Sequence, residues 1–326
     1  MSEAVLLLAH GTPNVLGEMA EYLNKVTGGR QVPLEVVEEL QHRYQLIGLR
    51  ETIGDEPPPL TKWTLEQGRL LDRNLLDNQL KTKVYVAMRN WHPYIADVIS
   101  QMRQDGVTRF RAVCLAPQNS RTSVGLYRKA TLAASEGMEV EFVAGWAEHP
   151  LLAEAFAEKF RKVWQPACIE EGRKLPVLFT AHSVPCRTVM GDSPDPYPVE
   201  AKATARMVAE RMAHDGLREQ DCYFAFQSQG VSGGPWIGPT VEETLKSLRE
   251  EGHTGVVIQP VGFLCDHVEV LYDIDIAFKE LADKIGLKLL RAESLNDSPL
   301  LVKALAEVAT GQYRAAVIET VAVAGV

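Results

Sequence analysis

The sequence predicts an α/β protein built from two doubly wound lobes, each with a parallel sheet between layers of helices. Three observations support this prediction: short apolar runs alternate with longer amphipathic stretches, most runs are apolar throughout, and the whole pattern occurs twice. A strand that is apolar on both faces is typical of a parallel sheet covered on both sides. A chain of 326 residues also exceeds the usual size of a single core, which favours two lobes.

The strand predictions rest on short runs of aliphatic and aromatic residues bounded by polar or turn residues. The chain opens with such a run, Ala-Val-Leu-Leu-Leu-Ala, and the second half opens with another, Val-Leu-Phe-Thr-Ala. The predicted strands are, in order, residues 4–9, 84–88, 110–116, 140–144, 177–181, 223–226, 256–261 and 287–290.

Between these runs, apolar residues recur at spacings of three and four, as in helices that cover a sheet. Examples are residues 95–105, 150–165, 198–215 and 241–251. The prolines Pro57, Pro58 and Pro59 indicate a loop that cannot be regular helix. We expect an N-terminal lobe at residues 1–165 and a C-terminal lobe at residues 166–326, whose last helix could pack back on the first lobe, with a cleft between the two.

The charge and hydropathy of the chain exclude several classes of protein. The net charge is -9 without a long run of Lys or Arg, which argues against a nucleic-acid partner. No apolar stretch reaches the ~20 residues that cross a bilayer, and the start lacks the basic region of a signal peptide. We therefore expect a cytoplasmic protein with no transmembrane segment. The apolar tail, residues 317–326, is interpreted as a frayed or packed terminus rather than a docking segment.

Several common motifs are missing from the chain. The glycines form neither a dinucleotide fingerprint nor a P-loop, and no Gly-x-Ser-x-Gly elbow surrounds Ser183. The cysteines are widely spaced and form no Cys-x-x-Cys pair, so neither a disulfide framework nor an iron–sulfur cluster is expected. They are Cys114, Cys168, Cys186, Cys222 and Cys265.

Two histidines stand at the ends of predicted buried strands. His182 follows the run 177–181, and His10 follows the run 4–9 and precedes Gly11-Thr12-Pro13. Open α/β sheets bind their ligands at the carboxyl ends of the strands, so both side chains could face one crevice. A histidine that caps a strand and bonds to backbone is the alternative for His182.

Two carboxylates follow the predicted strand at 256–261. Glu269 and Asp273 are four residues apart, so on a helix they share one face. A solvated helix face is the ordinary interpretation, but the apolar residues around Glu269 favour a partly buried acid. His267 could ligate a metal in place of His182, although on a helix it points away from Glu269.

These residues belong to a longer series of motifs through which the chain resembles the ferrochelatases. The motifs keep the order of the family and span nearly the whole chain. They are Leu-Leu-Leu-Ala-His-Gly-Thr-Pro at 6–13, Leu-Ala-Pro-Gln at 115–118, Ala-His-Ser-Val-Pro at 181–185, Gly-Asp at 191–192, Asp-Pro-Tyr-Pro at 195–198, Gln-Ser-Gln at 227–229, Pro-Trp-Ile-Gly-Pro at 235–239, Pro-Val-Gly-Phe at 260–263 and the segment around Glu269.

The resemblance implies a chelatase-type fold of two Rossmann-like halves, with a porphyrin in the cleft between them. It implies that the protein is a lyase of haem biosynthesis that inserts Fe²⁺, a substrate, and needs no cofactor. His182 and Glu269 match the catalytic pair, which is also expected to contact the metal. Asp273 and Asp275 match an acidic line taken as a metal path, in which Ala277 replaces a glutamate.

Within the family, the segments 235–239 and 266–273 look closest to the coproporphyrin III enzymes of monoderm bacteria, which implies that coprohaem is the product. In those enzymes a tyrosine usually precedes Gly-Thr-Pro and ligates the product iron, so His10 is a possible axial ligand of haem here. Thr27 and Pro58 depart from the pattern at substrate-contacting positions. The expected porphyrin contacts are His10, Arg43, Tyr44, Arg89, Tyr127 and Trp236.

Other functions stay open at this stage. Protoporphyrin IX could be the substrate, giving protohaem. A cobalt or sirohydrochlorin-type chelatase would share the fold, but such enzymes tend to carry paired histidines in the second lobe, where this chain has Glu269. A haem carrier without catalysis is a further alternative. Transient contact with neighbouring haem-pathway enzymes is possible for any of these.

Overall fold

A computed structural model describes residues 4–230, 233–315 and 317–322, and it contains two sheets. In the first sheet, the strand order is β2-β1-β3-β4-β9, and all neighbours are parallel except β9, which is antiparallel to β4. Its strands are β1 (Ala4–Ala9), β2 (Lys83–Met88), β3 (Arg109–Cys114), β4 (Glu139–Gly145) and β9 (Val317–Ala322).

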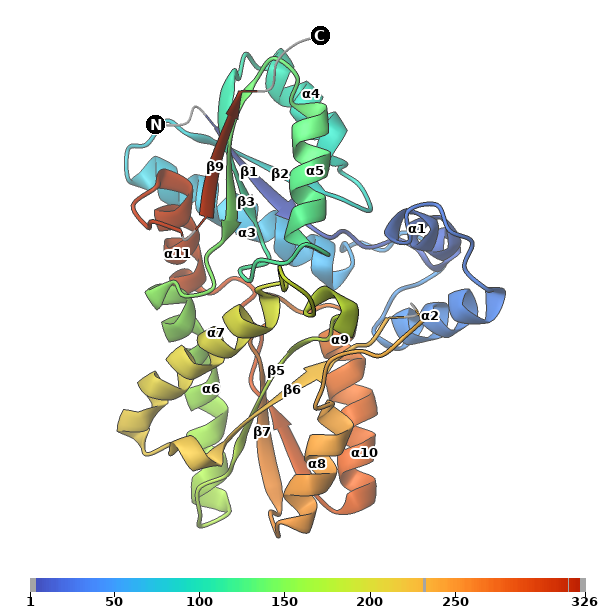
Figure 1. The fold of residues 1–326 in the computed structure, drawn as a ribbon, viewed down its shortest axis with the longest axis vertical. Coiled ribbons are helices and arrows are strands. Elements are labelled where there is room, and N and C mark those ends of the chain that lie inside the picture. The colour runs from blue at the N-terminus through green and yellow to red at the C-terminus, as the bar shows by residue number, and fades with distance from the viewer. Residues whose placement is uncertain (1–3, 231–232, 316, 323–326) are drawn as a thin grey trace.

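The second sheet is wholly parallel, with the strand order β6-β5-β7-β8. Its strands are β5 (Val177–His182), β6 (Cys222–Gln227), β7 (Gly255–Pro260) and β8 (Lys288–Arg291). The two sheets lie toward opposite ends of the long axis of the molecule (Figure 1). Together they confirm the predicted fold class, and every predicted strand is present with small shifts at its ends.

Helices cover both sheets, and one pair forms an arm. The first-lobe helices are α1 (Met19–Val26), α2 (Leu34–Leu46), α3 (Pro59–Asp77), α4 (Ile95–Gln104) and α5 (Val124–Ala134). They are followed by α6 (Pro150–Glu170), α7 (Tyr197–Met212), α8 (Val241–Glu250), α9 (Val268–Leu271), the π-helix η5 (Asp273–Phe278), α10 (Lys279–Ile285) and α11 (Pro299–Thr310). Figure 1 shows α1 and α2 projecting to one side of the molecule, with α2 near the level of α9.

The lobes share a core. One cluster of buried apolar side chains includes Val5 and Val113 from the first sheet and Val177 and Val257 from the second. The end of the chain also returns to the first lobe, because α11 packs against α3 and α6 and β9 pairs with β4. The division of the chain at residue 165 stays a prediction, since α6 runs through that position.

Polar contacts fix the lobes to each other beside the cleft. In the loop after β3, the Gln118 side chain donates to the carbonyl of Val261 (3.0 Å). The next residue, Asn119, donates its backbone N–H to Glu200 of α7 (2.7 Å). Buried polar groups in folded proteins are hydrogen-bonded, and breaking such bonds is costly. These contacts therefore favour a fixed position of one lobe relative to the other.

One detail differs from the sequence analysis. Pro59 is the first residue of α3 rather than part of a loop, because a helix needs no N–H at its first position. The described part of the tail, Val317–Ala322, is an edge strand, which agrees with a packed terminus. Within the described residues, no helix is both long and apolar enough to span a membrane.

Candidate active site

The two strand-end histidines occupy equivalent places in the two sheets. His182 is the last residue of β5, and His10 directly follows β1, and each of these strands lies between two parallel neighbours. The carboxyl ends of both strands meet the region between the lobes, where ligands of open α/β sheets bind. The structure therefore places both histidines at one candidate site.

His182 faces Glu269. The Nε2 atom of His182 lies 3.5 Å from Oε1 of Glu269, and each side chain is about a third exposed. The Nδ1 atom of His182 contacts the carbonyl oxygen of Ser183, which can only accept, so Nδ1 carries the proton of the neutral ring. Nε2 is then the basic nitrogen, and it points at the carboxylate. The backbone contact proposed as the alternative role of His182 is present together with this pairing.

The backbone around Glu269 is held by two further contacts. Glu269 lies in the first turn of α9, and His267 caps that helix by accepting the Glu269 N–H at Nδ1 (3.2 Å). The buried Gln227 donates to the Glu269 carbonyl (2.7 Å). His267 therefore has a structural part in placing Glu269, and its ring packs edge-on against Phe263.

The pair is strongly polarised. Burial opposes charge on His182, but the Glu269 carboxylate and the hydrogen bond to it outweigh burial, so the pKa of His182 lies above its ordinary value. Burial likewise opposes charge on Glu269, but the positive charge of His182 lowers the pKa of Glu269 to about 2. At neutral pH the carboxylate is ionised, and it stabilises a protonated imidazole.

Asp273 extends the acidic face by one turn. It begins the π-helix η5, in which the Ala277 N–H bonds to the Tyr272 carbonyl (3.0 Å), and π-turns of this kind are frequent at functional sites. Ser228 donates to Asp273 Oδ2. Arg43 of α2 reaches to 4.0 Å from Oδ1. Burial nevertheless raises the pKa of Asp273 to about 6.

Asp275 does not share that environment. The Arg291 guanidinium holds the Asp275 carboxylate with two hydrogen bonds (2.6 and 2.9 Å). An ion pair of this geometry neutralises the charge that a metal path would need. The structure therefore separates Asp275 from Asp273, although the sequence analysis placed both on one acidic line.

The first lobe presents a neutral, hydrogen-bonded face. Asn90 donates to Nε2 of His10 (3.0 Å), and Nδ1 of His10 contacts the hydroxyl of Tyr22 (3.1 Å). Tyr22 in turn hydrogen-bonds Tyr44, which also accepts from Thr12 (3.3 Å). The buried chain fixes one neutral tautomer of His10, with the proton on Nδ1.

The electrostatic setting of His10 is opposite to that of His182. Burial, assisted by the positive charge of Arg89, lowers the pKa of His10 to about 4.

Gly11 follows with a φ of +86°, and a side chain there would meet the backbone nitrogen of Trp91 at 2.8 Å. Only glycine fits this turn, which directs the chain away from the strand end.

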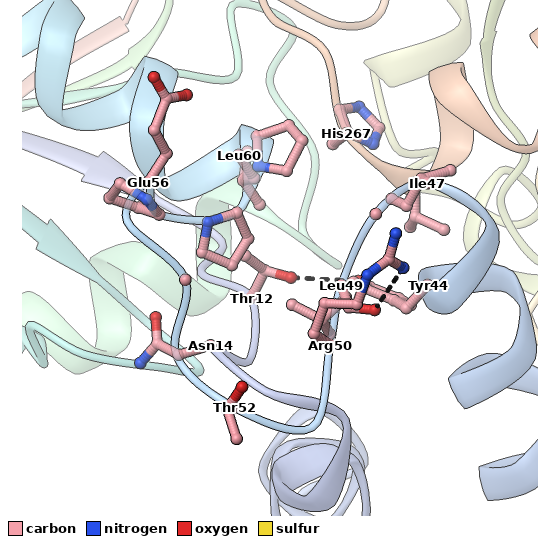
Figure 2. A pocket seen from close by; sticks show the side chains of 16 residues that line it. Thr12, Asn14, Tyr44, Ile47, Leu49, Arg50, Thr52, Glu56, Leu60 and His267 are labelled. Carbon is pink, nitrogen blue, oxygen red and sulfur yellow. Dashed lines mark hydrogen bonds between the residues drawn. The ribbon is translucent and has the colours of Figure 1, made fainter.

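A pocket of about 230 Å³ adjoins this face. It is lined by Thr12 and Tyr44, by the loop before α3, and by His267 and Val268 from the second lobe. Figure 2 shows the loop curving around the pocket, with Thr12 and Tyr44 joined by their hydrogen bond and His267 on the ribbon of the second lobe. The pocket thus receives residues from both lobes, as a cleft between them requires.

The remaining predicted porphyrin contacts lie around the same region. Trp236 is half-buried with its ring centroid 6.3 Å from that of His182. The Arg89 guanidinium lies over the ring of the buried Tyr127 (5.8 Å). The Arg43 guanidinium lies over the ring of Tyr272 (5.1 Å).

The described residues contain no group of three or more His, Cys, Asp or Glu side chains arranged to hold a metal ion. All five cysteines are free thiols, and Cys114 and Cys265 are buried. Metal contact at this site would therefore come from pairs of ligands such as His182 and Glu269, which bind an ion loosely.

Sequence reasoning missed several residues of the site. Tyr22 and Asn90 were not singled out, and Gln227 and Ser228 appeared only within the family motif at 227–229 without a role, although each of the four contacts a predicted site residue. Gln227 ends β6 and Ser228 follows it, while Asn90 lies just after β2. If every polar residue at the carboxyl end of a predicted strand had been considered, and not only the histidines, these three residues would have been site candidates.

Comparison with known proteins gives a consistent result. Residues 2–313 match the family model described as Ferrochelatase. A ferrochelatase of Acidobacterium capsulatum is 56% identical over 319 residues, covering 94% of this chain and 93% of that protein. A coproporphyrin III ferrochelatase of a Geobacillus species is 32% identical over 310 residues, covering 93% and 96%. Among solved structures, a cobalt complex of the sirohydrochlorin chelatase SirB from Bacillus subtilis shares the fold at 12% identity, with a TM-score of 0.53 over 95% of this chain and 97% of that one. The chain belongs to the ferrochelatase family.

Proposed function

We propose that this protein inserts Fe²⁺ into a porphyrin bound between its lobes, as a lyase of haem biosynthesis. The observation that carries the proposal is the pairing of His182 Nε2 with Glu269 Oε1 at 3.5 Å, opposite the neutral face of His10, Tyr22 and Tyr44. A basic nitrogen, a carboxylate and a hydrogen-bonded wall are the groups that metal insertion into a flat macrocycle needs.

The reaction replaces two pyrrole protons with one Fe²⁺ ion. His182 Nε2 accepts the two pyrrole protons one after the other and releases the first to solvent before it takes the second, since its side chain is about a third exposed. Its raised pKa makes it a stronger base than free imidazole. Glu269 stabilises the imidazolium that forms and offers an oxygen to the metal. Asp273 lies one turn beyond Glu269 and can receive protons or Fe²⁺ on the outer side. Because no group of three or more ligands surrounds the site in the described residues, the ion is released to the porphyrin rather than trapped.

We infer that coproporphyrin III is the substrate, with coprohaem as product. Coproporphyrin III ferrochelatases among the relatives support this, as does the presence of Arg43, Arg89 and Arg50 around the cleft, since four carboxylates require cations. Arg43 already forms ion pairs with Glu39 (2.8 Å) and Asp273 (4.0 Å), which leaves less positive charge for the carboxylates of a substrate. Protoporphyrin IX, which has fewer carboxylates, is therefore kept as the alternative substrate. Tyr44, Tyr127 and Trp236 would contact the ring or its substituents, and His10 would bind the iron of the product.

The test is anaerobic, multiple-turnover metallation with Fe²⁺, using coproporphyrin III and protoporphyrin IX side by side. We expect turnover with a preference for coproporphyrin III of at least about tenfold in kcat/KM, a difference of about 1.4 kcal/mol. Glu269→Gln should lower kcat by about 100-fold or more, while Glu280→Gln, at an exposed position of α10, should not.

Each alternative predicts a different result. Preference for protoporphyrin IX would contradict the proposed substrate but not metal insertion. Insertion only of Co²⁺, or only into a sirohydrochlorin-type ring, would contradict the proposed reaction. Tight haem binding with metallation at the uncatalysed rate would indicate a carrier. We further infer a cytoplasmic enzyme that needs no cofactor, with transient contact to neighbouring haem-pathway enzymes.

A further inference from the structure

Glu269 and Asp273 lie in the irregular first part of one helical stretch. Glu269 is in α9, Asp273 opens the π-helix η5, and α10 follows η5 directly and runs to Ile285. The π-turn interrupts the regular α-helical hydrogen bonding between α9 and α10. The positions of both carboxylates therefore depend in part on contacts from outside this stretch.

Arg291 contacts residues on both sides of Glu269 and Asp273 in the chain. This residue ends β8, and its side chain is 17% exposed. Its Nε and Nη2 atoms donate to the two oxygens of Asp275 (2.6 and 2.9 Å), beyond Asp273. Its Nη1 atom lies 3.4 Å from Oδ1 of Asp266, ahead of Glu269. One guanidinium thus bridges two carboxylates that flank the catalytic segment in the chain.

Asp266 is fixed by two more residues from the loop after β8. Ser294 donates to its Oδ1 atom (2.7 Å), and the side-chain amide of Asn296 donates to Oδ2 (2.9 Å). In return the Asp266 N–H donates to Asn296 Oδ1 (2.9 Å). We call Asp266, Asp275, Arg291, Ser294 and Asn296 the Arg291 clamp.

The clamp reaches across to the first lobe. Asn296 has a φ of +45°, a conformation that asparagine tolerates better than most residues. Its carbonyl accepts a hydrogen bond from the Gln67 side chain of α3 (2.9 Å), and Gln67 is 1% exposed. The loop that holds the start of the Glu269 segment is therefore itself fixed to the opposite lobe.

We propose that Arg291 is a positioning residue for metal insertion: through Asp266 and Asp275 it sets Glu269 and Asp273 against His182 and Ser228. The inference rests on the proposed function. Asp275, which the family resemblance assigned to a metal path, then acts on the metal only through Arg291. Small displacements of catalytic groups are costly, and a shift of about 1 Å can lower a rate by roughly 100-fold.

The two roles of Asp275 predict opposite results for one substitution. If Asp275 were a metal ligand, Arg291→Lys would loosen the two-point pairing of Asp275 with Arg291. The Asp275 carboxylate would then be freer to bind Fe²⁺, and Fe²⁺ capture would improve. If Arg291 positions the segment, Arg291→Lys keeps the charge but loses the planar two-point contact, so Fe²⁺ capture becomes worse. Asp275→Asn should then have a similar effect, and the double variant should be no worse than either single one.

The experiment measures anaerobic initial rates while Fe²⁺ and porphyrin are varied separately. For Arg291→Lys we expect kcat/KM for Fe²⁺ to fall about tenfold, with the porphyrin dissociation constant, from quenching of porphyrin fluorescence, within about twofold of the unaltered protein. The matched control is Arg161→Lys, which alters a partly buried Arg–Asp pair with Asp215 (2.9 Å) far along α6. It should change neither quantity.

The outcomes separate the inference from the proposed function. If the unaltered protein does not turn over, the proposed function fails and this inference falls with it. If it turns over and Arg291→Lys keeps its kcat/KM for Fe²⁺, or improves it, the positioning role is wrong. Equal losses for Fe²⁺ and porphyrin, accompanied by lower thermal stability, would indicate a purely structural residue and would also overturn it. Asp275→Asn provides the same comparison should Arg291→Lys not fold.

Discussion

His10 and His182 are the same residue type at the same topological position, yet the protein gives them opposite properties. Each stands at the carboxyl end of a strand with parallel neighbours on both sides, one in each lobe. His182 faces the carboxylates of the second lobe, and its pKa is raised. His10 faces amide and hydroxyl groups, and its pKa falls to about 4.

The difference shows that the neighbours of a strand-end histidine, and not its place in the fold, decide its chemistry. A carboxylate at 3.5 Å makes His182 a base that can keep a proton. A donor on Nε2, together with burial and the charge of Arg89 that outweigh the pull of Glu269, makes His10 a neutral group whose lone pair is already used. The second-lobe face, with His182, is suited to proton transfer and metal contact. The first-lobe face, with His10, is suited to holding the porphyrin ring, or to binding iron once Asn90 no longer donates to His10 Nε2.

The largest expected effect is the loss of the base on the second-lobe face. His182→Ala should lower kcat by about 100-fold to 10,000-fold, because it removes the basic nitrogen that faces the Glu269 carboxylate and accepts the pyrrole proton. The wild-type rate should also fall as pH drops through the raised pKa of His182, because the imidazolium cannot accept a pyrrole proton. The measurement is anaerobic turnover as a function of pH.

A matched control for this substitution is His253→Ala. His253 lies before β7, at the opposite end of the second sheet from His182, and its charged neighbour is Glu251 (3.8 Å). Its removal should leave kcat within about twofold of wild type. If His182→Ala were as active as His253→Ala, the contrast between the two faces of the cleft would have no catalytic meaning.

A smaller effect is expected at Asp273. Its pKa of about 6 means that the carboxyl is largely protonated at pH 5 and ionised at pH 7.5. Asp273→Asn should therefore raise the KM for Fe²⁺ by about tenfold at pH 7.5, equivalent to about 1.4 kcal/mol, and change it little at pH 5. Asp283→Asn, at an exposed position of α10, provides the control. An equal change at both pH values would mean that the charge of Asp273 is not involved.

The same substitution should stabilise the fold at high pH. The folded-state pKa of Asp273 lies above the ordinary value of 3.8, so the folded protein binds this proton more tightly than the unfolded chain. The contribution of Asp273 to stability is then greatest below its unfolded-state pKa and is lost as pH rises through about 6. Asp273→Asn should raise the free energy of unfolding by about 2 kcal/mol at pH 8 and by almost nothing at pH 4. Urea unfolding at the two pH values checks this, and a gain at pH 4 would contradict it.

The sequence alone predicts the strands and the ends at which the site forms. Buried parallel strands are continuous apolar runs, so residues 4–9 and 177–181 were recognisable without a partner, and they located His10 and His182. The edge strand β9 was not recognised as a strand, because its pairing with β4 joins segments far apart in the chain.

The electrostatics of the site depend on contacts that no local pattern specifies. Asp273 and Asp275 are alike in sequence, but one meets Ser228 and the other is neutralised by Arg291 from another strand. Likewise, nothing near His10 in sequence indicates that Asn90 covers its Nε2 atom. The family resemblance points to the residues, and tertiary packing sets their pKa values and tautomers.

The smallest expected effect concerns the first-lobe face, where His10 can bind product iron only after Asn90 releases Nε2. Losing that hydrogen bond removes a competitor worth about 1 kcal/mol, so Asn90→Ala should tighten binding of the haem product about fivefold. His10→Ala should abolish this gain and change the absorption spectrum of the product complex, because the axial nitrogen is missing. His92→Ala, which removes an exposed histidine of the adjacent loop, should change neither. A product spectrum unaffected by His10→Ala would mean that His10 only lines the cleft and does not bind iron. The two histidines would then share no role in metal contact.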